Sequence, residues 1–360
     1  MSFPKPPASR PLGEQPGTGP VLLVAPHAPA ELSAAAAFVD DTDAVQAALA
    51  EHVENWHDLG SGVALQAAAA LLRAPALWPI LPRGLMDLNR GWQGRAEEQE
   101  SLFGKGALDE WVASHLKEGA GPVLQDWYRA SLAQIRTAAG EAGVRGFVEI
   151  HSYGDLGSTY DRRCGGRPVR RAEAAIVCAT PWATAYPVGL ARLLPGDLRG
   201  TPWSLQQQLG EALGRHGFEL GPSPYPAQGP WCLSARFLAA RWFEWLGRQG
   251  QLPAETAAHL AELAWTDEHD AAMEAAATGR APELPPLLGV RSLASSMAEW
   301  SHEAGRLGDA FVRGSSCFTL VVEMRNDREA ESGLFGQAVA EGLRKFLELP
   351  SVVGKSSGKG

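Results

Sequence analysis

Three largely apolar segments that are rich in β-branched residues end in side chains of the kinds that bind metal ions. The segments and the residues that follow them are Val21–Ala25 with His27, Val148–Ile150 with His151, and Phe318–Val322 with Glu323. Short apolar runs of this kind are typical of strands buried in a parallel sheet. In open α/β sheets, ligands bind outside the carboxyl ends of the strands. Two imidazoles and a carboxylate at one sheet edge therefore indicate a metal-dependent hydrolase site.

Segments with a helical spacing of apolar residues alternate with the strand-like runs. We expect helices at residues 44–53, 61–72, 108–117, 123–143, 201–215, 233–245, 253–278 and 334–347. Further strands are expected at residues 78–81, 172–179 and 218–220. In the helix that ends near Arg215, Thr201 is the expected N-cap and Pro202 stands in the first turn. This alternation predicts an α/β fold with a mixed, largely parallel central sheet and helices on both faces.

Composition and charge restrict the class of partner. The 360 residues carry a net charge of −9 and are 45% hydrophobic, which is ordinary for a globular protein and argues against general binding of nucleic acid. The longest apolar stretch, near residues 64–72, is too short to span a bilayer, and residues 1–19 lack the apolar core of a signal peptide. The four cysteines form no C-x-x-C pair. We therefore expect a cytoplasmic protein that binds neither nucleic acid nor membranes, and the sequence does not define its oligomeric state.

The domain organisation is predicted to be simple. Residues 1–19 are rich in Pro and Gly and predict a flexible leader, and residues 351–360 predict a flexible tail. Residues 20–350 are interpreted as a single catalytic α/β domain.

A catalytic zinc ion usually has three protein ligands and a water, so His27 and His151 need a third donor. Glu31 lies four residues after His27 and reaches back if a turn begins there. Asp58 stands where a helix is expected to begin, and its alternative role is to stabilise that helix end by its charge. His57 is a further candidate donor. The sequence leaves the choice between Glu31 and Asp58 open.

Glu323 ends a strand that is otherwise largely apolar. A bare charge is costly to bury, so this carboxylate needs either a partner or a role. One interpretation is a general base that takes a proton from a metal-bound water. The alternative is an ion pair with an arginine such as Arg325.

The string Asp87-Leu88-Asn89-Arg90 places an arginine beside an amide and a carboxylate. The guanidinium of Arg90 is suited to bind a substrate carboxylate through two hydrogen bonds, and Asp87 could orient it. Arg83 is a second candidate to contact an anion or to polarise a carbonyl oxygen. A solvated turn explains the same string equally well.

Together, these residues resemble the N-formylglutamate amidohydrolase family, which is similar in fold to the zinc carboxypeptidases and the aspartoacylase-type deacylases. The resemblance covers about residues 20 to 348 and follows the family's order along the chain. The matching motifs are Pro26-His27, Asp58-Leu59-Gly60-Ser61, Arg83 with Asp87-Leu88-Asn89-Arg90, Glu149-Ile150-His151-Ser152, Gly217-Phe218 with Pro224-Tyr225, and residues 322–327. This resemblance implies a central sheet like that of the zinc carboxypeptidases, of the phosphorylase/hydrolase-like type.

The resemblance also implies an activity and a set of site residues. It implies one zinc ion per chain, bound by His27, His151 and an acidic residue, with Glu323 as the catalytic carboxylate. Arg83 or Arg90 would neutralise an oxyanion or a substrate carboxylate. The polar residues of the motifs that are assigned to substrate binding are Asp87, Asn89, Arg90, Ser152, Tyr225 and Arg325. The expected substrate is an N-acyl, formyl-like amino acid or a small peptide-like amide that carries a carboxylate.

The sequence departs from the family pattern in several places. The residues after His27 are Ala28-Pro29-Ala30-Glu31, where family members often have Gly, Ser or Asn. The position three residues after His27, which is acidic in carboxypeptidases, is Ala30 here. Glu149 stands where an Asp is usual. Residues 250–315 exceed the family core and are interpreted as a helical insertion that acts as a lid or a partner surface.

Three alternatives remain open from the sequence. The first is a binding or regulatory protein on the same fold whose metal site has decayed, and the second is a carboxypeptidase-like metallopeptidase. The third is a serine hydrolase that uses Ser152 beside His151. No G-x-S-x-G elbow supports it, and adjacent residues of a strand point to opposite faces.

Overall fold

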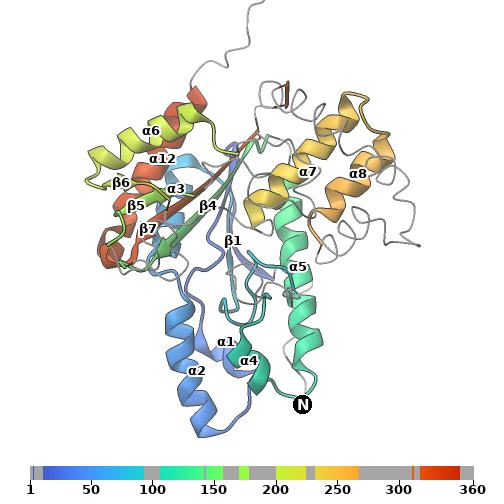
Figure 1. Cartoon of the computed structure of the whole chain (residues 1–360), viewed down its shortest axis with the longest axis vertical. Helices are drawn as coiled ribbons and strands as arrows, with labels where there is room; N and C mark the ends of the chain where they lie inside the picture. Colours follow the sequence, from blue (N-terminus) through green and yellow to red (C-terminus); the bar gives the residue numbers. More distant parts are fainter. Residues whose placement is uncertain are drawn as a thin grey trace, which may run out of the picture.

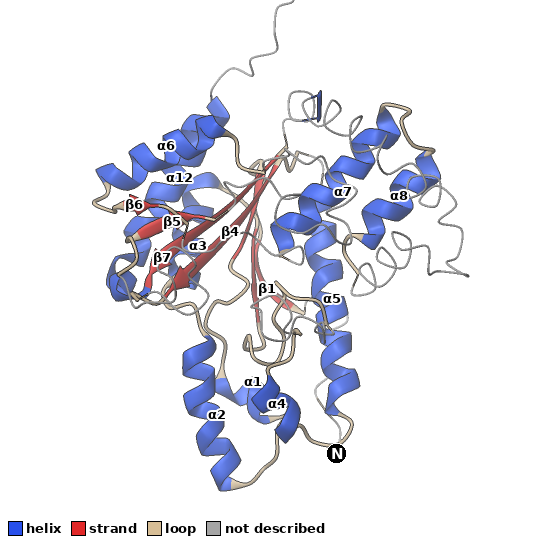
Figure 2. Cartoon of the chain, viewed as in Figure 1, coloured by secondary structure: helices blue, strands red, loops and turns tan. Residues whose placement is uncertain are grey.

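In the part of the chain that the structure describes, seven strands form a central mixed sheet with helices packed on both of its faces (Figure 1, Figure 2). The computed structural model describes residues 3, 11–92, 106–141, 143–156, 170–177, 200–223, 232–266, 310–311 and 317–348. The strands are β1 (Leu12–Gln15), β2 (Val21–Val24), β3 (Ala76–Pro79), β4 (Gly146–Tyr153), β5 (Ala174–Ile176), β6 (Leu220–Gly221) and β7 (Phe318–Arg325). Their order across the sheet is β1-β3-β2-β4-β7-β5-β6.

The middle of the sheet is parallel and its edges are antiparallel. Strands β3, β2, β4 and β7 run in the same direction. Strand β1 is antiparallel to β3, and β5 and β6 run antiparallel to β7. The predicted mixed, largely parallel α/β sheet is therefore confirmed. Because β2, β4 and β7 are neighbours, the loops that follow them meet at one edge of the sheet.

The helices form two layers. Helices α3, α6 and α12 cover one face of the sheet, and α5 and α7 cover the other (Figure 1). The bounds of the helices in the described residues are α1 (Leu32–Ala36), α2 (Asp43–Trp56), α3 (Ser61–Leu72), α4 (Glu110–His115), α5 (Ala120–Gly140), α6 (Trp203–Arg215), α7 (Leu233–Arg248), α8 (Ala254–Leu263), the 3-10 helix η4 (Asn326–Glu331) and α12 (Ser332–Glu348).

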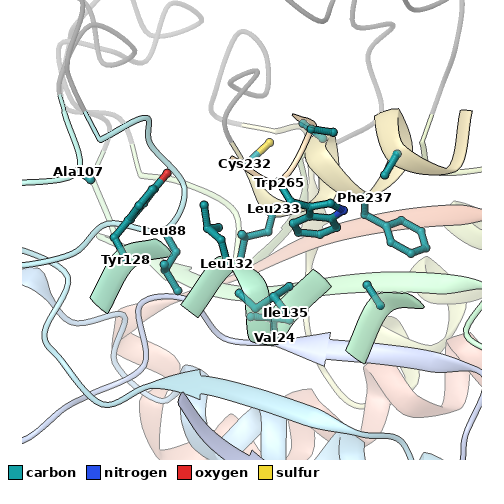
Figure 3. Packing of buried hydrophobic residues seen from close by; sticks show 14 of the residues in the cluster. Val24, Leu88, Ala107, Tyr128, Leu132, Ile135, Cys232, Leu233, Phe237 and Trp265 are labelled. Atoms are coloured by element: carbon teal, nitrogen blue, oxygen red, sulfur yellow. The ribbon is translucent and has the colours of Figure 1, made fainter. Parts of the chain in front are cut away.

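The alternation of side chains along β4 separates core from site. Val148 and Ile150 point into the cluster that packs under α3 and α12. On the other face, Phe147 joins the cluster formed with α5 and α7, part of which is shown in Figure 3. Glu149 and His151 share this second face, because side chains two residues apart in a strand point the same way. The face is therefore apolar where β4 begins and polar where it ends.

Strand β1 corrects the predicted extent of the flexible leader. Residues 12–15 pair with β3, and Leu12 is 2% exposed. The Leu12 backbone N–H also donates to Gln134 Oε1 at 2.9 Å. The sequence did not predict this strand, because residues 1–19 are rich in Pro and Gly and show no alternation of apolar and polar residues. Residues 1–2, 4–10 and 351–360 lie outside the described residues.

The ends of two helices also differ from the predictions. Pro202, rather than Thr201, is the N-cap of α6, and the Thr201 hydroxyl instead donates to the Thr319 carbonyl of β7 at 2.8 Å. Helix α8 ends at Leu263, and the carbonyls of Ala264 and Thr266, which follow it, accept hydrogen bonds from the buried Arg236 guanidinium. Residues 267–309, most of the expected insertion, lie outside the described residues.

Among the helices that the structure describes, none combines the length and apolar character needed to cross a lipid bilayer.

Candidate metal centre

The side chains predicted to form the site lie at the carboxyl ends of β2, β4 and β7. His27 follows β2, and His151 and Glu323 lie near the ends of β4 and β7. The parallel register pairs His151 directly with Glu323. All three side chains are buried, with 4 to 6% of their surface exposed. The expected convergence at one sheet edge is thus present.

Asp58 is brought to the same place by the loop that precedes α3. Its backbone N–H donates to the His27 carbonyl at 2.9 Å, which ties the two loops together. Gly60, the N-cap of α3, has φ of 76°, and a Cβ there would collide with Ser332. Only glycine suits a position that combines a left-handed backbone with so close an approach. The Asp-Leu-Gly-Ser motif therefore sets where α3 begins and holds Asp58 in the loop just before it.

His27, Asp58 and His151 form the candidate metal centre. One donor atom from each lies within 4.8 Å of the others. His151 Nδ1 lies 2.8 Å from Asp58 Oδ2, and His27 Nδ1 lies 3.4 Å from the same oxygen. The imidazole rings are 4.9 Å apart between centroids. Two imidazole nitrogens and a carboxylate oxygen are a donor set that suits zinc and other divalent ions.

A second carboxylate lies behind each imidazole. His27 Nε2 is 2.9 Å from Asp87 Oδ1, and His151 Nε2 is 3.2 Å from Glu149 Oε2. If each Nε2 carries a proton, it donates to that carboxylate, and the lone pair of Nδ1 faces Asp58. This carboxylate–imidazole arrangement is the usual outer shell of a histidine metal ligand. The residues present therefore fit a metal ion held on the two Nδ1 atoms and Asp58.

The buried charges shift the acidities of these groups. Burial favours the neutral form of His151, but hydrogen bonds to Asp58 and Glu149 outweigh it and raise the pKa of His151 to about 10. Burial also acts to raise the pKa of Asp58, yet the two imidazoles together lower it well below its usual value. Asp58 is consequently ionised at neutral pH, as a metal ligand must be.

Asp87 is held among positive groups. Its Oδ2 accepts hydrogen bonds from Arg83 Nε and Arg90 Nε, each at 2.9 Å. Burial opposes ionisation of Asp87, but Arg83, His27 and Arg90 keep its pKa well below the usual value. The carboxylate predicted to orient an arginine therefore contacts two of them and an imidazole as well.

The side chain of Asn89 forms hydrogen bonds with Glu149 and with the backbone of α7. Its Nδ2 donates to Glu149 Oε2 at 2.7 Å and lies 3.3 Å from His151 Nε2. Its Oδ1 accepts from the backbone N–H of Leu233 at 3.1 Å. The adjacent Leu88 packs with Tyr128 and Leu132 of α5, which fixes this loop against the core (Figure 3).

Tyr153 and Arg325 make a further set of polar contacts at the ends of β4 and β7. Burial, together with the charge of nearby Glu323, raises the pKa of Tyr153, whose hydroxyl donates to the Ala172 carbonyl at 2.6 Å. Arg325 donates to Asp327 and to the Arg171 carbonyl, each at 2.6 Å. These contacts of Arg325 hold together the loops around β5 and β7.

The remaining predicted residues lie apart from the imidazoles or outside the described structure. Glu31 is exposed at the start of α1, where its carboxylate accepts from Ser33. The structure therefore brings Asp58, rather than Glu31, to the two histidines. Ser152 Oγ is buried on the opposite face of β4 from His151 and has no hydrogen-bond partner among the described residues, so this geometry gives the serine hydrolase no support. Tyr225 lies outside the described residues.

Two features of the site were not predicted. One is the role of Glu149 behind His151, which the i, i+2 spacing on a strand could have indicated. The other is the backbone of α7, which donates to Glu149 and Asn89. Backbone donors carry no sequence signal.

The fold and the site define an α/β protein with a buried His–Asp–His group at the carboxyl edge of its sheet. The sequence matches no protein-family model and no curated protein. One similar solved structure is the gene product Atu2144 from Agrobacterium tumefaciens, with 15% identity, a TM-score of 0.44 and coverage of 94% of this chain and 97% of that chain. Another is an N-formylglutamate amidohydrolase from Ralstonia eutropha JMP134, with 11% identity, a TM-score of 0.45 and coverage of 93% and 96%. Function must therefore be argued from the residues of the metal centre.

Proposed function

We propose that this protein is a zinc-dependent amidohydrolase that cleaves the amide bond of an N-acyl, formyl-like amino acid or a small peptide-like amide. The observation that carries the proposal is the convergence of His27, Asp58 and His151, each buried, with Glu323 in register beside His151. Three protein ligands leave a position for water or substrate, as in catalytic zinc sites. Bound there, zinc would lower the pKa of a water and polarise the scissile carbonyl.

Glu323 is proposed as the general base and acid. Its carboxylate belongs to the strand next to His151 and lies on the same face of the sheet. Such a group can take a proton from the attacking water and deliver it to the nitrogen of the leaving amine. Protonation of that nitrogen allows the amide C–N bond to break without expelling an amide anion.

Arg83 and Arg90 are proposed to bind the anionic parts of the substrate. Asp87 fixes both guanidinium groups through their Nε atoms. The side chain of Arg90 is 13% exposed and that of Arg83 is 32% exposed, so both lie at the border between the site and solvent. We assign Arg90 to the substrate carboxylate and Arg83 to the oxyanion or to the same carboxylate.

The first test is metal binding by the purified, tag-free protein before and after addition of zinc. Wild type is expected to hold about one zinc per chain, and His151→Ala and Asp58→Asn are expected to lose it, because each removes a ligand. Glu31→Gln is the matched control and should retain the metal. Failure of wild type to bind metal would reject the proposal and favour a binding protein with a decayed site.

The second test is turnover of formyl-, succinyl- and peptidyl-amino acids. Glu323→Gln should keep the zinc and lose at least about 100-fold in kcat, the range expected for loss of a general acid–base group. Near-wild-type turnover by this variant would remove Glu323 from the mechanism. Preference for the peptidyl substrates would identify a peptidase instead.

A further inference from the structure

The first turn of α7 donates two backbone N–H groups into the candidate metal centre. Leu233 N–H donates to Asn89 Oδ1 at 3.1 Å, and Ser234 N–H donates to Glu149 Oε1 at 2.6 Å. The first N–H groups of any helix lack intrahelical acceptors. At α7 the N-cap residue, Cys232, supplies no side-chain cap. Side chains of the metal centre therefore take over the capping of this helix.

Asn89 connects the same helix end to both carboxylates that lie behind the imidazoles. Its side-chain Nδ2 donates to Glu149 Oε2 at 2.7 Å, and its backbone N–H donates to Asp87 Oδ1 at 3.0 Å. These are the oxygens that face His151 Nε2 and His27 Nε2. One residue thus fixes the outer partner of each imidazole.

Glu149 is fully buried, and each of its carboxylate oxygens accepts a hydrogen bond. The first turn of α7, where the helix dipole is positive, lies at this carboxylate and favours a negative charge there. Because one oxygen is bound by Ser234 and the other by Asn89, the carboxylate cannot rotate. Its position therefore fixes the ring orientation of His151.

We propose that Asn89, Glu149 and the first two N–H groups of α7 form a positioning clamp that holds Nε2 of His151 as the protonated nitrogen and directs Nδ1 toward Asp58. Asn89 then acts as a positioning residue for the metal centre, and its effect on substrate is indirect. The inference rests on the metal centre of the proposed function and is independent of which bond the protein cleaves.

The test is the zinc dissociation constant, measured by competition with a chromophoric chelator. Glu149→Gln and Asn89→Ala are expected to weaken zinc binding by about 10- to 100-fold, the usual effect of losing an outer-shell partner. The matched controls are Glu244→Gln, on the same helix but paired with Arg241, and Asn55→Ala, on α2. Both controls should bind zinc within about twofold of wild type.

A second measurement reports directly which nitrogen of His151 carries the proton. In zinc-loaded wild type, long-range ¹H–¹⁵N spectra should show His151 protonated at Nε2. Binding of zinc through Nε2 would overturn the clamp, even if Glu149→Gln fails to fold and its affinity cannot be measured. Thermal unfolding shows whether the Glu149→Gln variant is folded.

The outcomes separate this inference from the proposed function. Wild-type affinity in both folded clamp variants overturns the clamp and leaves the hydrolase proposal standing. A raised KM in Asn89→Ala with unchanged zinc affinity makes Asn89 a substrate contact and also overturns the clamp. If the clamp variants bind zinc more weakly than wild type, and wild type hydrolyses no amide, the clamp is supported and the proposed activity is rejected. A wild type that binds no zinc rejects both.

Discussion

Asp87 holds two arginines and one imidazole with a single carboxylate. Its Oδ2 accepts from the Nε atoms of Arg83 and Arg90, and its Oδ1 faces His27 Nε2. Because the guanidinium group is planar, a hydrogen bond at Nε fixes the direction of its other two nitrogens. The residue that orients a metal ligand therefore also orients the arginines proposed to bind substrate.

Arg90→Ala should raise KM for a carboxylate-bearing N-acyl amino acid by about 10- to 100-fold, with a smaller change in kcat. A hydrogen bond to a charged group contributes about 1.5–3 kcal/mol, which corresponds to this range. The check is steady-state kinetics with the carboxylate substrate and its carboxamide analogue, for which KM should change little. Zinc content is measured in parallel, because Asp87 also contacts His27. Equal effects on both substrates would contradict carboxylate binding by Arg90.

At the scale of elements, α12 lies against both α3 and α6 (Figure 1). Glycines in α12 allow these close approaches. A Cβ on Gly336 would lie 2.2 Å from the Ala64 carbonyl oxygen of α3, and one on Gly342 would lie 2.8 Å from Leu209 Cα of α6. Since α3 begins directly after the Asp58 loop, this packing also supports the position of a proposed metal ligand.

Gly336→Ala should destabilise the protein by about 1–3 kcal/mol, although alanine favours helices. Overpacking against backbone costs about 1–3 kcal/mol and exceeds the gain in helix propensity of up to about 1 kcal/mol. Gly214→Ala in α6 is the control, since nothing lies within 4 Å of its Cβ position, and it should stabilise by up to about 1 kcal/mol. Urea unfolding measures both. Stabilisation by Gly336→Ala would show that α12 can move away from α3.

At the scale of the whole molecule, the sequence predicts the strands better than it predicts the contacts between loops. Apolar periodicity located β2, β4 and β7 and hence the edge where their loops meet. It left Asp58 and Glu31 as equal candidates, because 93 residues separate Asp58 from His151 and only the folded sheet brings them within 2.8 Å. The N–H groups of α7 could not be predicted, since every residue except proline has one.

The same buried network predicts how the stability of the metal-free protein depends on pH. Asp58 and Glu149 raise the pKa of His151 from 6.5 to about 10, so the folded chain keeps a proton that the unfolded chain releases above pH 6.5. The stabilisation is complete below pH 6.5 and is lost as pH rises to about 10. Across this window, the free energy of unfolding should fall by about 1.4 kcal/mol per pH unit on account of His151.

Urea unfolding in the presence of a chelator, at several pH values between 6.5 and 10, measures this slope. Other groups also titrate near the upper limit, so the decisive quantity is the difference between wild type and His151→Gln, which should lack this contribution. His216→Gln, at the ion pair with Glu341, is the control and should keep it. Saturating zinc should reverse the trend, because metal ligands must be deprotonated and the affinity rises with pH. Equal slopes for wild type and His151→Gln would show that His151 holds no such proton in the folded chain.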